Sequence, residues 1–126
     1  MGKRVPRTRA SNTMTEAGFW TFIRSNLRLA TLKWKPKRDA KLAARREYKG
    51  PNKRQKWEFQ CAMCEEWFLD RETQVDHIIP AGSCKSFADM EGFIERLFCE
   101  VDGFQVLCKN CHQEHKTNVQ RNKKTP

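Results

Sequence analysis

Apolar residues recur at every third or fourth position near the start of the chain. Over residues 15–32 this spacing predicts an amphipathic helix with one buried stripe. The stripe consists of Phe19, Phe22, Ile23, Leu27 and Ala30. Pro36 is expected to stop or kink the chain, because proline lacks a backbone N–H and clashes with the preceding turn. Residues 37–48 then predict a second, strongly basic helix that ends at the turn-forming residues 50–52.

The pattern changes after residue 52. Short apolar or alternating runs predict strands, and two longer runs with helical spacing predict helices. The expected strands cover residues 57–60, 66–69, 73–79 and 104–107, and the expected helices cover residues 86–99 and 109–119. We therefore expect an α+β fold in which a basic α-helical extension, residues 1–52, precedes a compact domain, residues 53–126.

Positive charge is concentrated in the first half of the chain. The net charge is +10, but residues 1–60 hold 17 lysines and arginines against 4 acidic residues, whereas residues 61–126 hold 8 against 11. The first half is therefore expected to neutralise the phosphates of a nucleic acid. The residues expected to do so are Lys33, Lys35, Lys37, Arg38, Lys41, Arg45, Arg46 and Lys49. The alternatives are a solvated, partly disordered tail, an exposed helix face, or binding to a membrane surface.

Four cysteines form two pairs with the same spacing. The first pair is Cys61 and Cys64, and the second is Cys108 and Cys111. Two residues between thiolates allow both sulfurs of a pair to reach one tetrahedral ion, so the pairs predict a closed structural zinc site. Disulfides are the alternative, but they belong to oxidising compartments, and the first residues lack the apolar stretch of a signal peptide. We therefore expect a reduced, cytoplasmic protein.

The other two cysteines, Cys84 and Cys99, lack the paired spacing of metal ligands. Core packing or a free thiol is expected for them. Every apolar run is also far shorter than the roughly 20 residues that span a bilayer, so we expect no membrane partner.

Acidic and imidazole side chains accompany the cysteine pairs. Asp76 and His77 lie in the strand expected at residues 73–79, and His112 directly follows the second pair. The motifs are Cys61-x-x-Cys64, Val75-Asp-His-Ile-Ile-Pro80 and Gln105-Val-Leu-Cys-Lys-Asn-Cys-His112, followed by Lys116-Thr117. Over roughly residues 57–118 the chain resembles the HNH endonucleases of the ββα-metal class, and its layout is similar to that of small HNH proteins encoded by bacteriophages.

This resemblance implies metal-dependent hydrolysis of phosphodiester bonds in double-stranded DNA, as nicks or double-strand breaks. His77 matches the family's general base, which takes a proton from the water that attacks the phosphate. Asp76 and His112 match the ligands of one catalytic divalent ion, usually Mg2+ and sometimes Mn2+ or Ni2+. The implied fold is a ββα-metal core stapled by the four-cysteine zinc site. A homodimer, or a partner in phage DNA processing within a bacterial cytoplasm, is compatible with this function.

The sequence departs from the family pattern at two positions. Gly103 stands where the family has an asparagine that is thought to brace the loop and orient the general base; the neighbouring Asp102 is a partial substitute. His115 stands where a lysine often falls, and a surface position, a phosphate contact and a supporting role beside His112 remain open for it. The alternative function is therefore a catalytically weak or inactive zinc-stabilised nucleic-acid-binding module, or an accessory subunit of a phage DNA-processing machine.

Overall fold

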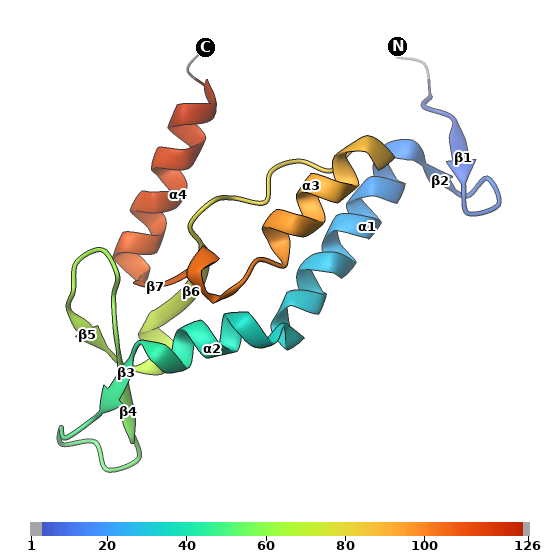
Figure 1. Cartoon of the computed structure of the whole chain (residues 1–126). Helices are drawn as coiled ribbons and strands as arrows, with labels where there is room; N and C mark the ends of the chain where they lie inside the picture. Colours follow the sequence, from blue (N-terminus) through green and yellow to red (C-terminus); the bar gives the residue numbers. More distant parts are fainter. Residues whose placement is uncertain (1–3, 125–126) are drawn as a thin grey trace. The chain divides into compact units, whose positions relative to one another are not determined.

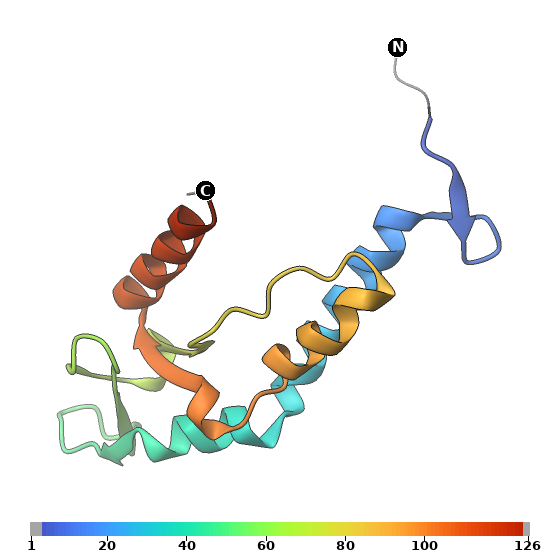
Figure 2. The ribbon, with the colours of Figure 1, turned by 45° about the horizontal axis from the view of Figure 1, so that its top comes forward.

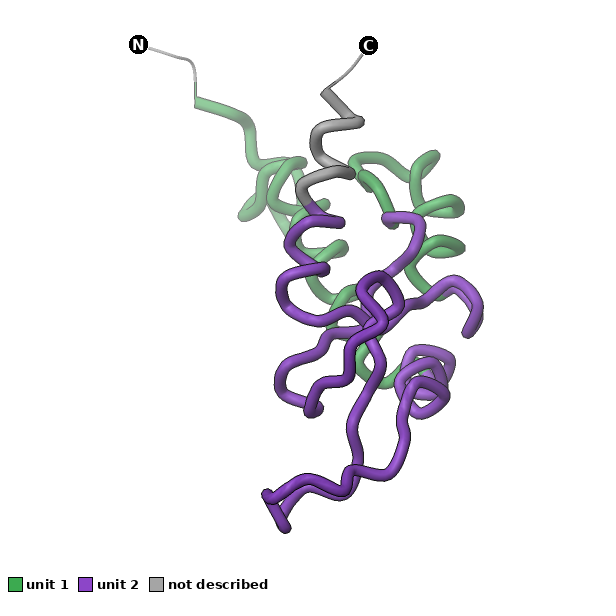
Figure 3. Tube along the Cα trace, turned by 90° about the vertical axis from the view of Figure 1, so that its left-hand side faces the viewer, with its two compact units in different colours: residues 1–34, 81–98 green, residues 35–80, 99–126 purple. Residues whose placement is uncertain are grey.

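The computed structural model describes the backbone of residues 4–124 and the side chains of residues 4–116. This described part is a mixed α/β structure with four α-helices and three small antiparallel sheets. The chain divides into two compact units, unit 1 with residues 1–34 and 81–98 and unit 2 with residues 35–80 and 99–126 (Figure 3). The predicted boundary at residue 52 does not coincide with this division, because strand pairing joins the chain on both sides of that residue within unit 2.

Unit 1 is built on two helices that lie side by side in both views of the ribbon (Figure 1, Figure 2). Helix α1 spans Glu16–Ala30 and is capped by Thr15, whose side-chain oxygen accepts a hydrogen bond from the backbone N–H of Gly18 at 3.0 Å. Helix α3 spans Phe87–Leu97, and a short 3-10 helix, η1, follows α1 at Thr31–Lys33. The helix predicted from the apolar spacing is confirmed, and Phe19, Ile23 and Leu27 of its predicted buried stripe pack against the core of unit 1. The other two members of the stripe, Phe22 and Ala30, are exposed.

The core of unit 1 lies between α1, α3 and the segment that leads into α3. Its buried residues are Trp20, Ala81, Cys84, Phe93 and Leu97. Two arginines hold the backbone of this segment: Arg24 donates to the carbonyl of Cys84 at 2.8 Å, and Arg96 donates to that of Ala81 at 2.7 Å. Cys84 is therefore a core residue, which is one of the two outcomes that its sequence context predicts.

A short hairpin precedes α1, and the sequence pattern does not predict it. Strand β1, Arg7–Arg9, pairs antiparallel with β2, Met14–Thr15, across a turn in which residues 10–12 all have left-handed φ angles of 53° to 65°. The side chain of Arg9 fixes the hairpin to α1 through an ion pair with Glu16 at 2.9 Å. The hairpin has no alternation of apolar and polar residues, which is the signal that normally identifies strands.

Helix α2 spans Lys35–Ala43, and it corrects two expectations. Pro36 does not stop the chain, because it lies in the first turn of α2, where a proline costs no intrahelical hydrogen bond. The basic helix expected over residues 37–48 ends at Ala43, and Arg45–Glu47 forms strand β3 instead. The pairing of β3 with the next strand, and the packing of its arginines on tryptophan rings, outweigh the local helical preference.

Two small sheets form the frame of unit 2. In the first, β3 pairs with β4, Trp57–Gln60, and β4 pairs with β5, Trp67–Phe68. In the second, β6, Thr73–His77, pairs antiparallel with β7, Phe104–Cys108. The short 3-10 helices that precede β6 and β7 are η2, Asp70–Glu72, and η3, Val101–Gly103.

Helix α4, Lys109–Lys124, follows β7 without a connecting loop, and α2 packs against β6 and β7 with Ala40 buried. The strands and helices predicted beyond residue 52 are confirmed as elements of these types, and α4 extends beyond the predicted end at residue 119. None of the described helices combines the length and the apolar character needed to cross a lipid bilayer.

Candidate metal centre

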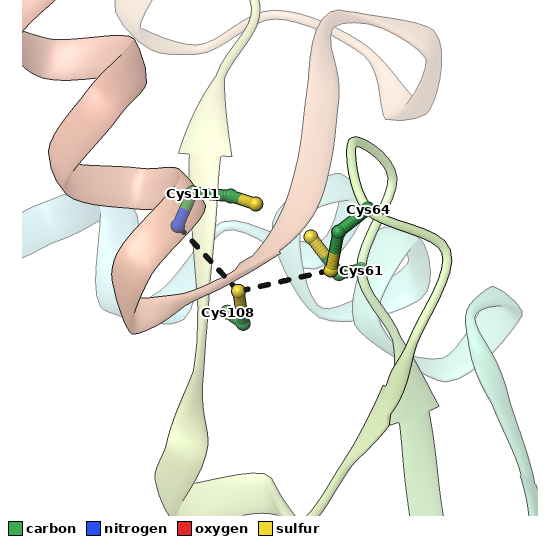
Figure 4. A group of neighbouring side chains, drawn as sticks. All are labelled: Cys61, Cys64, Cys108 and Cys111. Carbon is green, nitrogen blue, oxygen red and sulfur yellow. Dashed lines mark hydrogen bonds between the residues drawn. The ribbon is translucent and has the colours of Figure 1, made fainter.

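Four cysteine thiols meet between the first sheet, β7 and α4 (Figure 4). Cys61 directly follows β4, Cys64 lies in the loop before β5, Cys108 ends β7 and Cys111 lies in the first turn of α4. Their sulfur atoms all lie within 4.8 Å of one another, and those of Cys64 and Cys108 are 4.0 Å apart. Four sulfurs bound to one zinc ion at about 2.3 Å lie about 3.8 Å apart in a tetrahedron. The cluster is therefore compatible with a structural metal such as zinc.

Backbone hydrogen bonds shape the loop that carries the first cysteine pair. The N–H of Cys61 donates to the carbonyl of Glu66 at 2.9 Å, and the N–H of Glu65, which has a φ angle of 63°, donates to the carbonyl of Cys61 at 3.0 Å. These bonds close a tight turn that carries both thiols. A third bond, from the N–H of Ala62 to the carbonyl of Val106 at 2.8 Å, ties the turn to β7. The backbone itself thus brings the two pairs together.

The thiols of the cluster have unequal proton affinities. Burial raises the pKa of Cys61, but hydrogen bonds from backbone N–H groups outweigh burial and lower this pKa to about 6. The pKa of Cys111 rises to about 12, because its side-chain hydrogen bond with Cys108 and its burial both favour the protonated thiol. The backbone N–H groups around Cys61 therefore favour a thiolate in the cluster, and metal binding to the four cysteines would release protons.

A carboxylate and two imidazoles converge next to the second cysteine pair. The Oδ2 atom of Asp76 lies 3.9 Å from Nε2 of His112 and 3.7 Å from Nε2 of His115. Both distances are longer than a hydrogen bond, so these groups approach without satisfying one another. Nε2 of His115 is buried and has no hydrogen-bond partner among the described residues. A buried nitrogen of this kind needs an explanation. Among the described residues, the four cysteines are the group that lies close enough together to hold a metal ion, and the two imidazoles each approach the carboxylate of Asp76.

The fold brings these three side chains together through β7. Strand β6 pairs with β7 along its whole length, with Asp76 opposite Gln105, and α4 begins where β7 ends. His112 and His115 are three residues apart on α4 and therefore lie on one face of the helix. The structure thus brings together Asp76 and His112 from the predicted set. His115 joins them, and its spacing from His112 was the sequence signal that could have identified it.

His77 is held one position away from this carboxylate. Its backbone N–H donates to Oδ1 of Asp76 at 2.9 Å. Its ring packs against that of Phe104, its partner on β7, with the ring centres 4.8 Å apart. The imidazole of His77 therefore has a defined position against an aromatic side chain.

Gly103 also bears on the position of His77. A Cβ atom on Gly103 would lie 2.5 Å from Sγ and 2.9 Å from Cβ of Cys99, so a larger residue does not fit without movement of Cys99. The carbonyl of Gly103 accepts a hydrogen bond from the N–H of Ile78 at 2.9 Å. This bond continues the pairing of β6 and β7 by one residue, and it holds the backbone that follows His77.

The eight basic residues predicted to bind nucleic acid lie on several different elements. Lys33 lies on η1 in unit 1, Lys35, Lys37, Arg38 and Lys41 on α2, Arg45 and Arg46 on β3, and Lys49 in the loop after β3. All except Lys37 and Lys41 are exposed. The predicted continuous basic helix is thus replaced by two separate supports within unit 2, α2 and the β3–β4 hairpin.

Some of these charges are used inside the protein. Lys41, whose side chain is 18% exposed, pairs with Asp70 at 2.8 Å and donates to the hydroxyl of Thr73 at 2.7 Å. These contacts join α2 to η2 and to the start of β6. Arg46 pairs with Glu58 at 2.6 Å. Lys41 therefore has a structural role, whatever it contributes to binding.

No family model matches the chain, and comparisons with curated proteins and with solved structures gave no match either. The fold and the thiol geometry define the protein at the level of class. It is a mixed α/β protein whose four-cysteine cluster is compatible with a structural metal such as zinc.

We expect the chain purified from a zinc-containing medium to carry about one zinc ion, bound by four thiolates. Cys64→Ser should lose the ion, because serine removes one thiolate at an exposed position. Cys99→Ser is the matched control and should keep it. Because protons compete with the metal for thiolates, zinc release should become easier as the pH falls. Elemental analysis and a zinc indicator measure both effects; equal zinc in wild type and Cys64→Ser would refute the assignment.

The contact between Gly103 and Cys99 predicts that substitutions at these two positions have coupled effects on the free energy of unfolding. Gly103→Ala should lower the free energy of unfolding by about 1–3 kcal/mol, which is typical of overpacking. In the background of Cys99→Gly the same substitution should cost much less, because both atoms that obstruct the new Cβ belong to the Cys99 side chain. Urea denaturation of the four proteins measures the coupling. Equal costs in the two backgrounds would contradict the contact.

Proposed function

We propose that the protein is a metal-dependent endonuclease of the HNH type that hydrolyses phosphodiester bonds in DNA. The observation that carries the proposal is the convergence of Asp76 Oδ2 with the Nε2 atoms of His112 and His115, one of which is buried without a partner in the described part of the chain. The four-cysteine cluster is proposed as a structural zinc site, because four thiolates leave no open position for a reacting group.

Asp76, His112 and His115 are the proposed ligands of the catalytic ion. When bound there, a divalent ion supplies neutralisation of the charge that develops on the phosphate and on the leaving oxygen. Mg2+ prefers oxygen ligands, whereas Mn2+ and Ni2+ accept imidazole nitrogen more readily. With two imidazoles in the set, Mn2+ is the better fit to these side chains.

His77 is the proposed general base. A neutral imidazole nitrogen can accept a proton from water near neutral pH, which is what attack on a phosphate requires. Packing against Phe104 restricts its ring, and the bond from its backbone N–H to Asp76 holds its backbone. In this proposal the carbonyl of Gly103, bonded to the N–H of Ile78, supplies the bracing that the family obtains from an asparagine side chain.

Double-stranded DNA is the proposed substrate. Exposed basic residues such as Arg38, Arg45 and Lys49 are suited to phosphate contacts, which supply affinity without sequence specificity. One site of this type cuts one strand in each encounter, so nicking is the minimal product. A double-strand break would require a homodimer, a second binding event or a DNA-processing partner.

His77→Ala should lower the cleavage of supercoiled plasmid in Mn2+ by about 10²–10⁴-fold, the usual contribution of a positioned general base. Its zinc content and its affinity for Mn2+, measured by isothermal titration calorimetry, should stay unchanged. His112→Ala should lose both cleavage and Mn2+ binding, because it removes a proposed ligand. Gln113→Ala, at the exposed neighbouring position on α4, is the matched control and should keep both.

Cleavage by His77→Ala at the wild-type rate would remove His77 from the mechanism. Tight DNA binding by the wild type without cleavage in any metal would favour the second candidate, a zinc-stabilised nucleic-acid-binding module or an accessory subunit. The presence of Gly103 in place of the family asparagine is the observation that favours this second candidate.

A further inference from the structure

The segment from β3 to the start of β4, residues 45–57, carries a dense patch of positive charge; we call it the basic hairpin. Its basic residues are Arg45, Arg46, Lys49, Lys53, Arg54 and Lys56, and all six are exposed. Glu47 is its one acidic residue. The last three of these basic residues lie outside the set that the sequence predicts to bind nucleic acid.

The basic residues of the loop that connects β3 to β4, residues 48–56, form no ion pairs with the acidic residues of the described part of the chain. Glu58, at the base of the hairpin, pairs with Arg46 at 2.6 Å. Within the described residues Lys49, Lys53, Arg54 and Lys56 form no ion pair. Like charges gathered on one exposed loop repel one another, and an external polyanion relieves this repulsion. The loop thus has the charge of a surface that binds phosphates.

The loop also has a defined shape. The N–H of Tyr48 donates to the carbonyl of Lys56 at 2.9 Å, which extends the strand pairing, and the N–H of Gln55 donates to the carbonyl of Asn52 at 3.0 Å. A Cβ atom on Gly50 would overlap the ring of Tyr48, so glycine allows the chain to fold closely over this ring. Its basic side chains are therefore presented from an ordered turn.

Stacked arginines and tryptophans fix the base of the hairpin. The guanidinium of Arg45 lies 4.1 Å from the centre of the Trp57 ring, and that of Arg46 lies 3.8 Å from the centre of a ring of Trp67 on β5. Strand β4 then leads directly into Cys61. The hairpin is thus attached to the four-cysteine cluster, and it forms the end of unit 2 opposite α4 (Figure 1, Figure 3).

We propose that the basic hairpin binds the phosphate backbone of duplex DNA. A two-stranded ribbon fits the major groove of B-DNA, which is about 12 Å wide, and lysines and arginines along such a ribbon reach phosphates at the edges of the groove. The deep, narrow major groove of duplex RNA does not admit it. The inference rests on the proposed function for the class of substrate, and it assigns a contact surface separate from Asp76 and the histidines.

The test measures binding of the zinc-loaded full chain to a short labelled DNA duplex by fluorescence anisotropy, without added divalent ions, between about 50 and 200 mM salt. The variant Lys53→Gln/Arg54→Gln/Lys56→Gln should flatten the slope of log affinity against log salt by up to about 2.7, at about 0.9 for each lost phosphate contact. Lys53→Arg/Lys56→Arg, which keeps the charges, should keep the slope.

A control variant that loses the same number of positive charges elsewhere distinguishes an effect of the hairpin on the slope from an effect of the net charge. Arg4→Gln/Arg7→Gln/Lys85→Gln removes three exposed charges from unit 1 and should leave the slope close to that of the wild type. An unchanged slope in the hairpin variant, or an equal loss in this control, would overturn the proposal. Tighter binding to duplex RNA, or to vesicles of phosphatidylcholine and phosphatidylserine, than to duplex DNA would also overturn it.

The same samples distinguish this inference from the proposed function. Plasmid cleavage by the wild type, together with an unchanged slope in the hairpin variant, would reject the hairpin and keep the nuclease. A flattened slope, together with no cleavage by the wild type in any metal, would support the hairpin and reject the nuclease. All three substituted side chains are exposed, and unchanged zinc content verifies that the variant retains its fold.

Discussion

The junction between the loop after β4 and the start of α4 is the constraint on which the rest of unit 2 depends. The buried cluster at this junction consists of Cys61, Leu107, Cys108 and Cys111, with Phe68 packed against it. Three of these four buried residues carry small thiols, so burial of apolar surface contributes only a few kcal/mol there, at roughly 25 cal/mol per Å². A structural zinc ion supplies about 10–16 kcal/mol in comparable small domains. A metal bound by the four thiols would therefore dominate the stability of the junction.

The same junction determines whether the acidic and imidazole side chains meet. Asp76 is carried by β6 and the two histidines by α4, and these elements are joined through β7. A slip of one residue between β6 and β7 would turn Asp76 to the opposite face of the strand. The side chains of Phe104, Val106 and Leu107 on β7 are buried, which makes such a slip costly. The four-cysteine cluster and the pairing register of β6 and β7 thus together determine the position of the Asp76 carboxylate.

The sequence predicts the parts of this structure that depend on local spacing. Two residues between cysteines were enough to predict the cluster, and apolar spacing was enough to identify α1 and α3. The parts that it misses depend on distant residues. Strand β3 has the composition of a basic helix and is held by Trp57 and Trp67, while the contact of Arg24 with Cys84 joins positions 60 residues apart. The spacing of His115 from His112 places both on one face of α4, but the distance of His115 from Asp76 depends on the pairing of β6 with β7.

Packing against Cys99 explains why a glycine occupies position 103. HNH endonucleases, which the sequence resembles, have an asparagine at this position, and a glycine there would by itself indicate lost function. In the structure Cys99 occupies the space that a side chain at this position would need, so residues 99 and 103 form one packing unit. The backbone carbonyl of Gly103 remains available and bonds the residue after His77. A hydrogen bond of this kind contributes about 0.5–1.5 kcal/mol, comparable to a bond made by a neutral amide side chain. Under the proposed function, the backbone bond from Ile78 to Gly103 would brace the loop in place of an asparagine side chain, whereas the missing side chain remains the observation that favours the inactive alternative.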